Sequence, residues 1–170
     1  MSSASTINGN EKVVRILHRD WVVDNELQIN AFALRQNETY ISVNRPSIES
    51  YVSDVSDFVK NHASFRVSDD SQSIRLASLN VGEVRSISIS LGRQTVDLSV
   101  EVEPRDSHYQ SHAGIFTKLA GQNIKGGQQM DVSIDENTTL PIMAIFQKVQ
   151  YRLKELATLE EQPLGVNSKI

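Results

Sequence analysis

The feature that most constrains the fold is the alternation of apolar and polar residues over positions 86–103. Its apolar positions are Ile87, Ile89 and Leu91, followed by Val96, Leu98, Val100 and Val102. Successive side chains of a strand point to opposite faces, so the pattern predicts two strands with one apolar and one polar face. Gly92-Arg93-Gln94 lies between them and is typical of a hairpin tip. The chain is therefore expected to contain an antiparallel sheet.

Two other segments have apolar residues at helical spacing, which predicts amphipathic helices over about 47–61 and 140–160. The two stripes are Ile48, Tyr51, Val52, Val55, Phe58 and Val59, and then Ile142, Ile145, Phe146, Val149, Leu153 and Leu156. Ser47 is the expected N-cap of the first helix, and Pro141 fits the first turn of the second. These elements predict an α+β fold, with a mostly antiparallel sheet of about five or six strands and both helices on one face.

The length of 170 residues favours a single domain with its own core. Residues 1–10 are small and polar, and we expect them to be disordered. Residues 163–170 follow the end of the second helix, where Pro163 and Gly165 predict a loose tail. The single α+β domain is therefore expected to span residues 11–162.

Composition narrows the classes of partner. The formal net charge is −4, and no basic stripe with interleaved aromatic residues indicates nucleic-acid binding. No stretch approaches the roughly twenty apolar residues that cross a bilayer, and the N-terminal segment lacks the apolar middle of a signal peptide. The absence of cysteine excludes thiolate chemistry and fits a reducing compartment. We expect a soluble cytoplasmic protein without a cofactor, whose partner is neither a membrane nor a nucleic acid.

Two of the four histidines, His108 and His112, lie four residues apart just after the second predicted strand. Because the pKa of an imidazole lies near neutrality, they could act as general acid and base in phosphodiester chemistry, with Arg45 or Lys118 stabilising the charged intermediate. A metal site would need a third ligand such as Asp106 or His18, and the pair lacks the glutamate of a His-Glu-x-x-His motif. The structural alternative is that one histidine is hydrogen-bonded at the start of a strand and the other is solvated.

Arg45 is the third candidate site residue, because it lies where a predicted strand leads into the first helix. Exposed N–H groups and a guanidinium at such a junction suit an anion such as phosphate. The alternative is an ion pair between Arg45 and a surface carboxylate.

Three short patches carry a resemblance to known proteins. Ala31-Phe32, then Ile41-Ser42-Val43 with Arg45, and later His112-Ala113-Gly114-Ile115 resemble small uncharacterised bacterial proteins with an Ala-Phe, a Ser-Val and a late His-Ala-x-Ile step. This resemblance implies a bacterial accessory protein and no particular activity. The chain is also similar to the opening of ADP-ribosyltransferases, with His18 and Ser42 on successive strands, although the catalytic glutamate of that family has no counterpart here.

The leading hypothesis from the sequence is a small intracellular bacterial binding protein with an accessory role. Its partner would be another protein, bound through the exposed end of the sheet or the second helix, and that helix could also join two copies of the chain. The rival hypothesis is a histidine-dependent enzyme acting on a phosphodiester or nucleotide, similar to a ribonuclease or an ADP-ribosyltransferase. Its catalytic residues would be His108, His112 and Arg45, gathered in one pocket.

Overall fold

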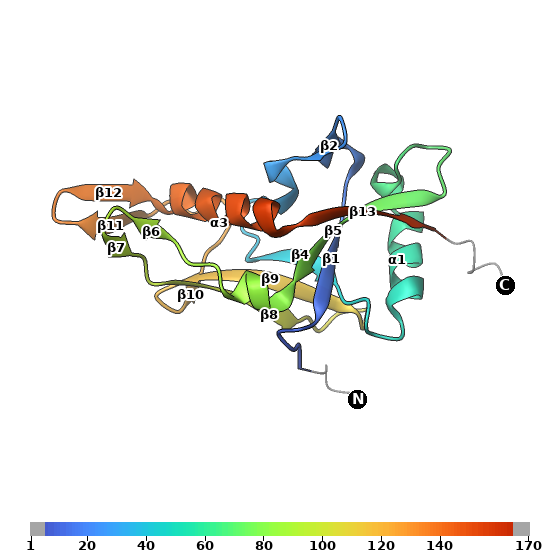
Figure 1. Cartoon of the computed structure of the whole chain (residues 1–170), viewed down its shortest axis with the longest axis horizontal. Coiled ribbons are helices and arrows are strands. Elements are labelled where there is room, and N and C mark those ends of the chain that lie inside the picture. The colour runs from blue at the N-terminus through green and yellow to red at the C-terminus, as the bar shows by residue number, and fades with distance from the viewer. Residues whose placement is uncertain (1–5, 165–170) are drawn as a thin grey trace.

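The computed structural model describes residues 6–164, and these form an α+β fold around one large antiparallel sheet (Figure 1). Within this range the main sheet has seven strands: β1 (Lys12–Ile16), β4 (Tyr40–Asn44), β5 (Ser73–Asn80), β8 (Leu98–Pro104), β9 (His112–Leu119), β10 (Gln122–Asn123) and β13 (Thr158–Pro163). Their order is β10-β9-β4-β1-β5-β13, and β8 also pairs with β9. The predicted fold class is confirmed.

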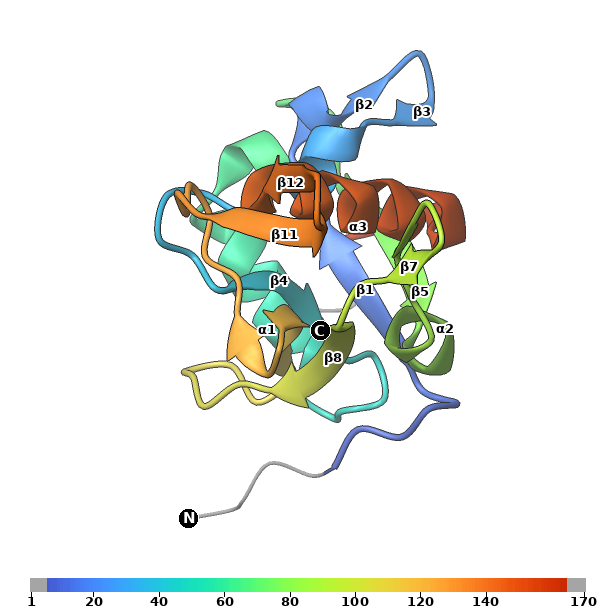
Figure 2. The same ribbon diagram turned by 90° about the vertical axis from the view of Figure 1, so that its left-hand side faces the viewer.

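Three α-helices and three short 3-10 helices accompany this sheet in the described part of the chain: α1 (Tyr51–Lys60), α2 (Val81–Arg85), α3 (Ile142–Leu156), η1 (Arg19–Trp21), η2 (Ile29–Phe32) and η3 (Ala63–Phe65). Three small hairpins are formed by β2 (Val22–Val23) with β3 (Glu26–Leu27), by β6 (Ser90–Leu91) with β7 (Gln94–Thr95), and by β11 (Asp131–Asp135) with β12 (Thr138–Pro141). Figure 2 shows the β2–β3 and β11–β12 hairpins at the periphery of the molecule.

The helices α1 and α3 cover opposite faces of the sheet, so the expectation that both lie on one face is wrong. Val13 packs in the core cluster that contains the α3 stripe, whereas its neighbour Val14 packs with Val55 of α1. Strand β5 divides in the same way, with Leu76 on the α1 face and Leu79 on the α3 face. Consecutive residues of a strand point to opposite faces of the sheet. A strand whose consecutive residues are all apolar is therefore covered by other elements on both faces.

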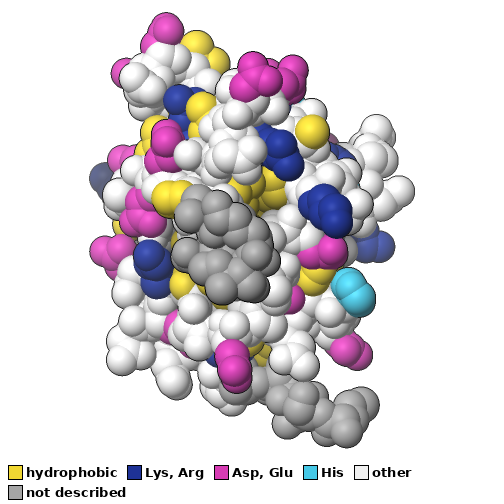
Figure 3. Space-filling model, turned by 90° about the vertical axis from the view of Figure 1, so that its right-hand side faces the viewer, with side chains coloured by type: hydrophobic (Ala, Val, Ile, Leu, Met, Phe, Trp, Pro, Cys, Tyr) yellow, Lys and Arg dark blue, Asp and Glu magenta, His cyan; other side chains and the backbone are white. Residues whose placement is uncertain are grey.

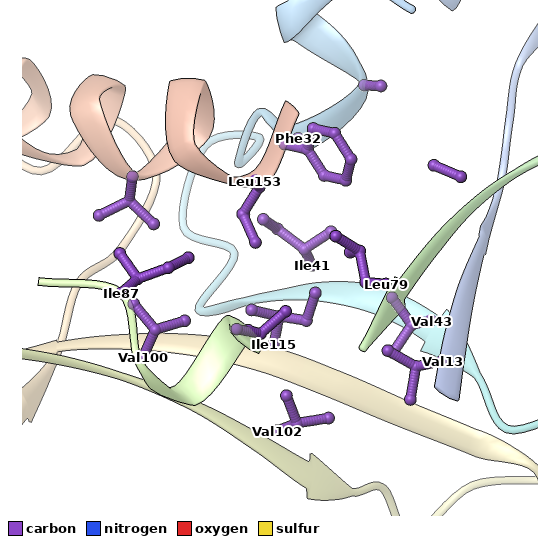
Figure 4. Packing of buried hydrophobic residues seen from close by; sticks show 14 of the residues in the cluster. Val13, Phe32, Ile41, Val43, Leu79, Ile87, Val100, Val102, Ile115 and Leu153 are labelled. Atoms are coloured by element: carbon purple, nitrogen blue, oxygen red, sulfur yellow. The ribbon is translucent and has the colours of Figure 1, made fainter. Parts of the chain in front are cut away.

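The larger core lies between α3 and the sheet (Figure 4). Leu153 of α3 and Phe32 of η2 pack above Ile41 and Ile115, which come from the neighbouring strands β4 and β9. Val100 and Val102, predicted as the apolar face of a strand, lie in this core on β8. The smaller cluster on the other face contains Tyr51, Val55 and Val59 of α1.

Both predicted helices form, with different limits. The first begins at Tyr51 rather than near Ser47, whose hydroxyl instead donates to Glu11. The second ends at Leu156, because residues 158–163 leave the helix and pair with β5 as an edge strand. The first half of the alternating stretch also differs: it follows the helical residues Val81–Arg85, and of it only Ser90–Leu91 pairs across the tip at Gly92. Asn80 caps α2 by accepting a hydrogen bond from Glu83 N.

The chain is ordered beyond the limits expected for the domain. Ile7 is buried in the larger core, and Thr6 O accepts a hydrogen bond from Arg45. At the other end Leu164 is buried in the α1 cluster. The rest of the expected disordered N-terminus and loose tail, residues 1–5 and 165–170, lies outside the described residues.

The surface carries charges of both signs. In the space-filling view of the end that bears α1 and the last residues of β13, acidic and basic side chains alternate without a basic stripe (Figure 3). None of the helices formed by residues 6–164 has the length and apolar character to cross a membrane.

Candidate functional site

The candidate site lies where β1 and β4 separate. These strands share the single residue pair Val14–Asn44 within the described residues, so the ladder ends there. The guanidinium of Arg15 occupies the opening beyond this pair: its Nη1 donates to Ser42 O and its Nε to Ala31 O, both at 2.9 Å. A charged side chain has replaced main-chain pairing beside Ser42, and this leaves space on the α1 face.

A pocket of about 530 Å³ is centred on this opening. It is lined by Arg15, Ile16, Trp21, Asn30, Ala33, Arg35, Glu38, Ser42, Asn44, Phe58, Phe65, Tyr109 and His112. A second hollow of about 250 Å³ shares Arg15, Ala33, Glu38 and Ser42 with it. The volume lies within the range of pockets that hold small organic molecules, roughly 300–1,000 Å³.

Ser42 and His112 form a hydrogen-bonded pair in the wall of this pocket, with Ser42 Oγ 2.7 Å from His112 Nε2. In the β4–β9 register Ser42 lies opposite Gly114 and Asn44 opposite His112, so the pair is diagonal across two neighbouring strands. Gly114 leaves room for Tyr40, because a Cβ at this position would lie 2.7 Å from the Tyr40 ring. Tyr40 in turn packs against the imidazole, with ring centroids 5.9 Å apart.

The surroundings of His112 favour its neutral form. Burial lowers its pKa below the ordinary value of 6.5, and the nearby positive charge of Arg105 lowers it further. The guanidinium of Arg105 itself lies over the Tyr40 ring, 4.5 Å from the centroid. At neutral pH the imidazole can therefore accept or donate one hydrogen bond through Nε2, depending on its tautomer.

Arg15 is a positive charge in the pocket wall without a carboxylate partner. Burial lowers its pKa to about 10, although the negative charge of Glu38 partly opposes this, so the group stays protonated at neutral pH. It stacks on Trp21, with the guanidinium carbon 4.8 Å from the ring centroid. Among residues 6–164 no carboxylate forms an ion pair with Arg15, and its Nη2 has no hydrogen-bond partner. Part of the side chain remains exposed through the pocket.

Part of the pocket wall is aromatic. Phe58 of α1 and Phe65 of η3 pack edge to face at 5.1 Å, and Trp21 meets Phe65 in the same way at 5.8 Å. His18 lies behind this wall, 5.4 Å from Phe65, and it does not line the pocket. The lining of the pocket thus combines cationic side chains with apolar, aromatic ones.

Helix α1 fixes the loop that leads to His112. The carboxylate of Asp54 accepts hydrogen bonds from Ser111 N at 3.0 Å and from Ser111 Oγ at 2.6 Å, and Asn44 Nδ2 donates to the same Ser111 Oγ. One turn further along α1, Asp57 accepts from the Tyr109 hydroxyl at 2.6 Å. This hydrogen bond is the main reason why the pKa of Tyr109 is raised to about 12.

The structure brings one of the three predicted catalytic residues into this pocket. His112 lines it, His108 is exposed and does not, and Arg45 is buried in an ion pair with Glu11, with Nε 2.7 Å from Oε1. The histidines match the structural alternative, because His112 is hydrogen-bonded as the first residue of β9 while His108 is solvated. Arg45 likewise matches the ion-pair alternative, except that the arginine is buried and its carboxylate is partly buried rather than at the surface. No group of three or more His, Asp or Glu side chains suited to a metal ion occurs within residues 6–164.

The sequence analysis missed Arg15, Asn44 and the role of Ser42. A signal was present for Arg15, because it interrupts the apolar run of Val13-Val14-Arg15-Ile16-Leu17 on a strand that packs on both faces.

Comparison of the chain with protein-family models, with curated protein sequences and with solved structures gives no match. The three patches that carry the resemblance described above nevertheless meet in space. Ala31 O and Ser42 O both accept hydrogen bonds from Arg15, and Ser42 Oγ contacts His112.

Proposed function

We propose that the protein binds a small anionic organic molecule in the pocket between β1, β4 and α1. The observation that carries this proposal is Arg15: a largely buried guanidinium that lines the pocket and whose hydrogen bonds within residues 6–164 go to two main-chain carbonyls. A buried charge is costly unless it is paired, so a site of this kind is stabilised when a ligand supplies the missing negative charge.

The guanidinium favours particular anions. Its planar, forked donors match the oxygens of a carboxylate or phosphate, and Nη2 is available for such a contact. Arg35 lies in the same lining and is close enough for its positive charge to lower the pKa of Arg15. The pocket is therefore a positively charged place in a chain whose net charge is −4.

The aromatic wall indicates what the rest of the ligand is like. Trp21, Phe58 and Phe65 contribute apolar ring surface to the lining of the pocket. A ligand that carries an apolar or aromatic body beside its anionic group would bury both parts, whereas an inorganic anion would bury one.

This proposal keeps the binding role expected from the sequence and changes the kind of partner. Five residues of the α3 stripe (Ile142, Ile145, Phe146, Val149 and Leu153) are buried in the protein itself. A partner protein, or a second copy, would have to use the other side of α3, where Tyr151 is half exposed. Protein binding through that helix stays a hypothesis. For the alternative of an enzyme with His108, His112 and Arg45 as its catalytic residues, only His112 lines the pocket between β1, β4 and α1.

Calorimetry with phenyl phosphate, phenylacetate, inorganic phosphate and the uncharged phenol tests the proposal. We expect the wild-type protein to bind at least one of the two aromatic anions more tightly than phenol or inorganic phosphate, and Arg15→Met to weaken that binding at least tenfold. The matched control is Arg93→Met, which removes the same charge at an exposed hairpin tip outside the pocket. Equal affinities for the wild-type protein and Arg15→Met, or no binding of either aromatic anion, would overturn the proposal.

A further inference from the structure

We propose that Ser42 is a nucleophile, with His112 as its general base, in the hydrolysis of esters that carry an anionic group. The inference rests on the proposed function, because Arg15 would hold that anionic group. It goes beyond binding by assigning a reaction to the polar wall of the pocket.

The first observation is the geometry of the pair. A serine hydroxyl becomes nucleophilic when a base lies within hydrogen-bond reach, and Ser42 Oγ and His112 Nε2 are 2.7 Å apart. Neither Ser42 Oγ nor His112 Nδ1 has another hydrogen-bond partner among residues 6–164. Both side chains belong to regular strands, so their relative position is held by the main-chain ladder of β4 and β9.

The second observation is that groups able to stabilise developing negative charge lie in the same pocket. Asn44 is two residues from Ser42 on the same strand face. Within the described part of the chain its amide Nδ2 donates one hydrogen bond, to Ser111 Oγ. Asparagine amides serve as oxyanion donors in other enzymes. Ser111 Oγ accepts this hydrogen bond from Asn44 and donates one to Asp54. Ser111 and Asp54 therefore orient the Asn44 amide and are positioning residues.

The reaction balances without a redox partner or a metal. Ser42 Oγ attacks the carbonyl carbon of the ester, and its proton passes to His112 Nε2. The tetrahedral anion collapses by breaking the bond to the alcohol oxygen, and the alcohol leaves with the proton from His112. A water molecule, deprotonated by His112, then attacks the acylated Ser42, releases the acid and restores the serine hydroxyl.

The test uses an alkyl fluorophosphonate, which reacts with activated serines by forming an Oγ–P bond and releasing fluoride. We expect intact-mass spectrometry of the full-length protein to show one phosphonyl adduct, and peptide mapping to place it on Ser42. Ser42→Ala should abolish the adduct and His112→Gln should slow its formation at least a hundredfold, the lower range for loss of a general base. Ser90→Ala, at an exposed position of β6, is the matched control and should react like the wild type.

A pH profile separates catalysis by His112 from a purely structural role. The labelling rate should fall as the pH drops through the pKa of His112, which burial and Arg105 place below the usual value. Tyr40 is the other titratable side chain in ring contact with the imidazole. A labelling rate that stays constant from pH 8 down to the pH at which the protein unfolds would contradict the role of His112 as base.

The outcomes distinguish this inference from the proposed function. A folded wild-type protein that binds phenyl phosphate through Arg15 but gains no adduct would overturn the inference and leave the binding role intact. An adduct on Ser42 without Arg15-dependent binding of an aromatic anion would support the nucleophile and refute the proposed function. An adduct that persists in Ser42→Ala would place the reactive group elsewhere and overturn the inference.

Discussion

Two arginines next to the same pair of strands have opposite surroundings. Arg45, which directly follows β4, is 4% exposed, and its Nε and Nη2 bind the two carboxylate oxygens of Glu11 at 2.7 and 3.1 Å. Arg15, on β1, is bound by two carbonyl oxygens and faces a pocket. Ser47 completes the first region by donating to Glu11.

The difference indicates that Arg45 stabilises the fold, whereas Arg15 is placed to bind a ligand. Burial alone would raise the pKa of Glu11, but hydrogen bonds from Arg45 and Ser47 outweigh burial and lower it. The Arg45 region is thus electrostatically complete, and it ties the N-terminal segment to the start of the α1 loop. In the Arg15 region Glu38 is near, but no carboxylate of residues 6–164 forms an ion pair with the guanidinium, which is the property expected of a binding site.

Breaking the Arg45–Glu11 ion pair should have the largest effect on the stability of the fold. Arg45→Met leaves the partly buried carboxylate of Glu11 without its cation, so we expect the free energy of unfolding to fall by about 3 kcal/mol, the lower end for breaking a buried pair. Urea denaturation measures the change. Adding Glu11→Leu to Arg45→Met removes the uncompensated charge and should restore part of the loss. A decrease below about 1 kcal/mol in the single variant would show that the pair contributes little.

The same substitution at Arg15 should reduce the free energy of unfolding by less. Arg15→Met removes two hydrogen bonds to carbonyls but leaves no charge behind, so we expect a loss of about 1–2 kcal/mol in the free energy of unfolding. Denaturation under identical conditions tests the contrast. If Arg15→Met destabilised the fold as strongly as Arg45→Met, the two regions would be equivalent and Arg15 would be structural.

A carboxylate added near Arg15 should make its surroundings similar to those of Arg45. Asn30 lines the pocket and is exposed, so Asn30→Asp places a carboxylate in the same lining as Arg15. We expect a gain in stability of up to about 1 kcal/mol that salt reduces, together with weaker binding of phenyl phosphate. Thermal unfolding at two salt concentrations and calorimetry measure these effects. Asn30→Ser is the control that removes the amide without adding charge.

The smallest expected effect is a pH dependence from His112. Its pKa in the folded protein lies below the ordinary value of 6.5, so the unfolded chain binds the proton more readily. The contribution of His112 to stability is therefore complete above pH 6.5 and is lost as the pH falls through the folded pKa. Comparing the free energy of unfolding at pH 7.5 and 5.5 in the wild type and His112→Gln isolates it. A wild-type decrease no larger than that of the variant would contradict the lowered pKa.

The sequence predicted the elements whose signal is local. The alternation around Val100 and Val102 predicted β8, and the stripes at Val55 and Val149 predicted α1 and α3. These signals are local because the spacing of apolar residues shows which face is buried without showing what it packs against. Residues 158–163 were assigned to the end of α3 and the tail, since their strand character depends on pairing with β5. The placement of the helices on opposite faces was missed for the same reason.

By itself the sequence determined the α+β class and the hairpin tip at Gly92, and it offered a histidine at the start of a strand as one alternative. Only the tertiary structure decided that His112 meets Ser42, 70 positions away, that Arg45 is neutralised by Glu11, and that Arg15 is not neutralised. Strand pairing sets these contacts, and pairing between distant segments is fixed by the packing of the whole sheet rather than by any local pattern.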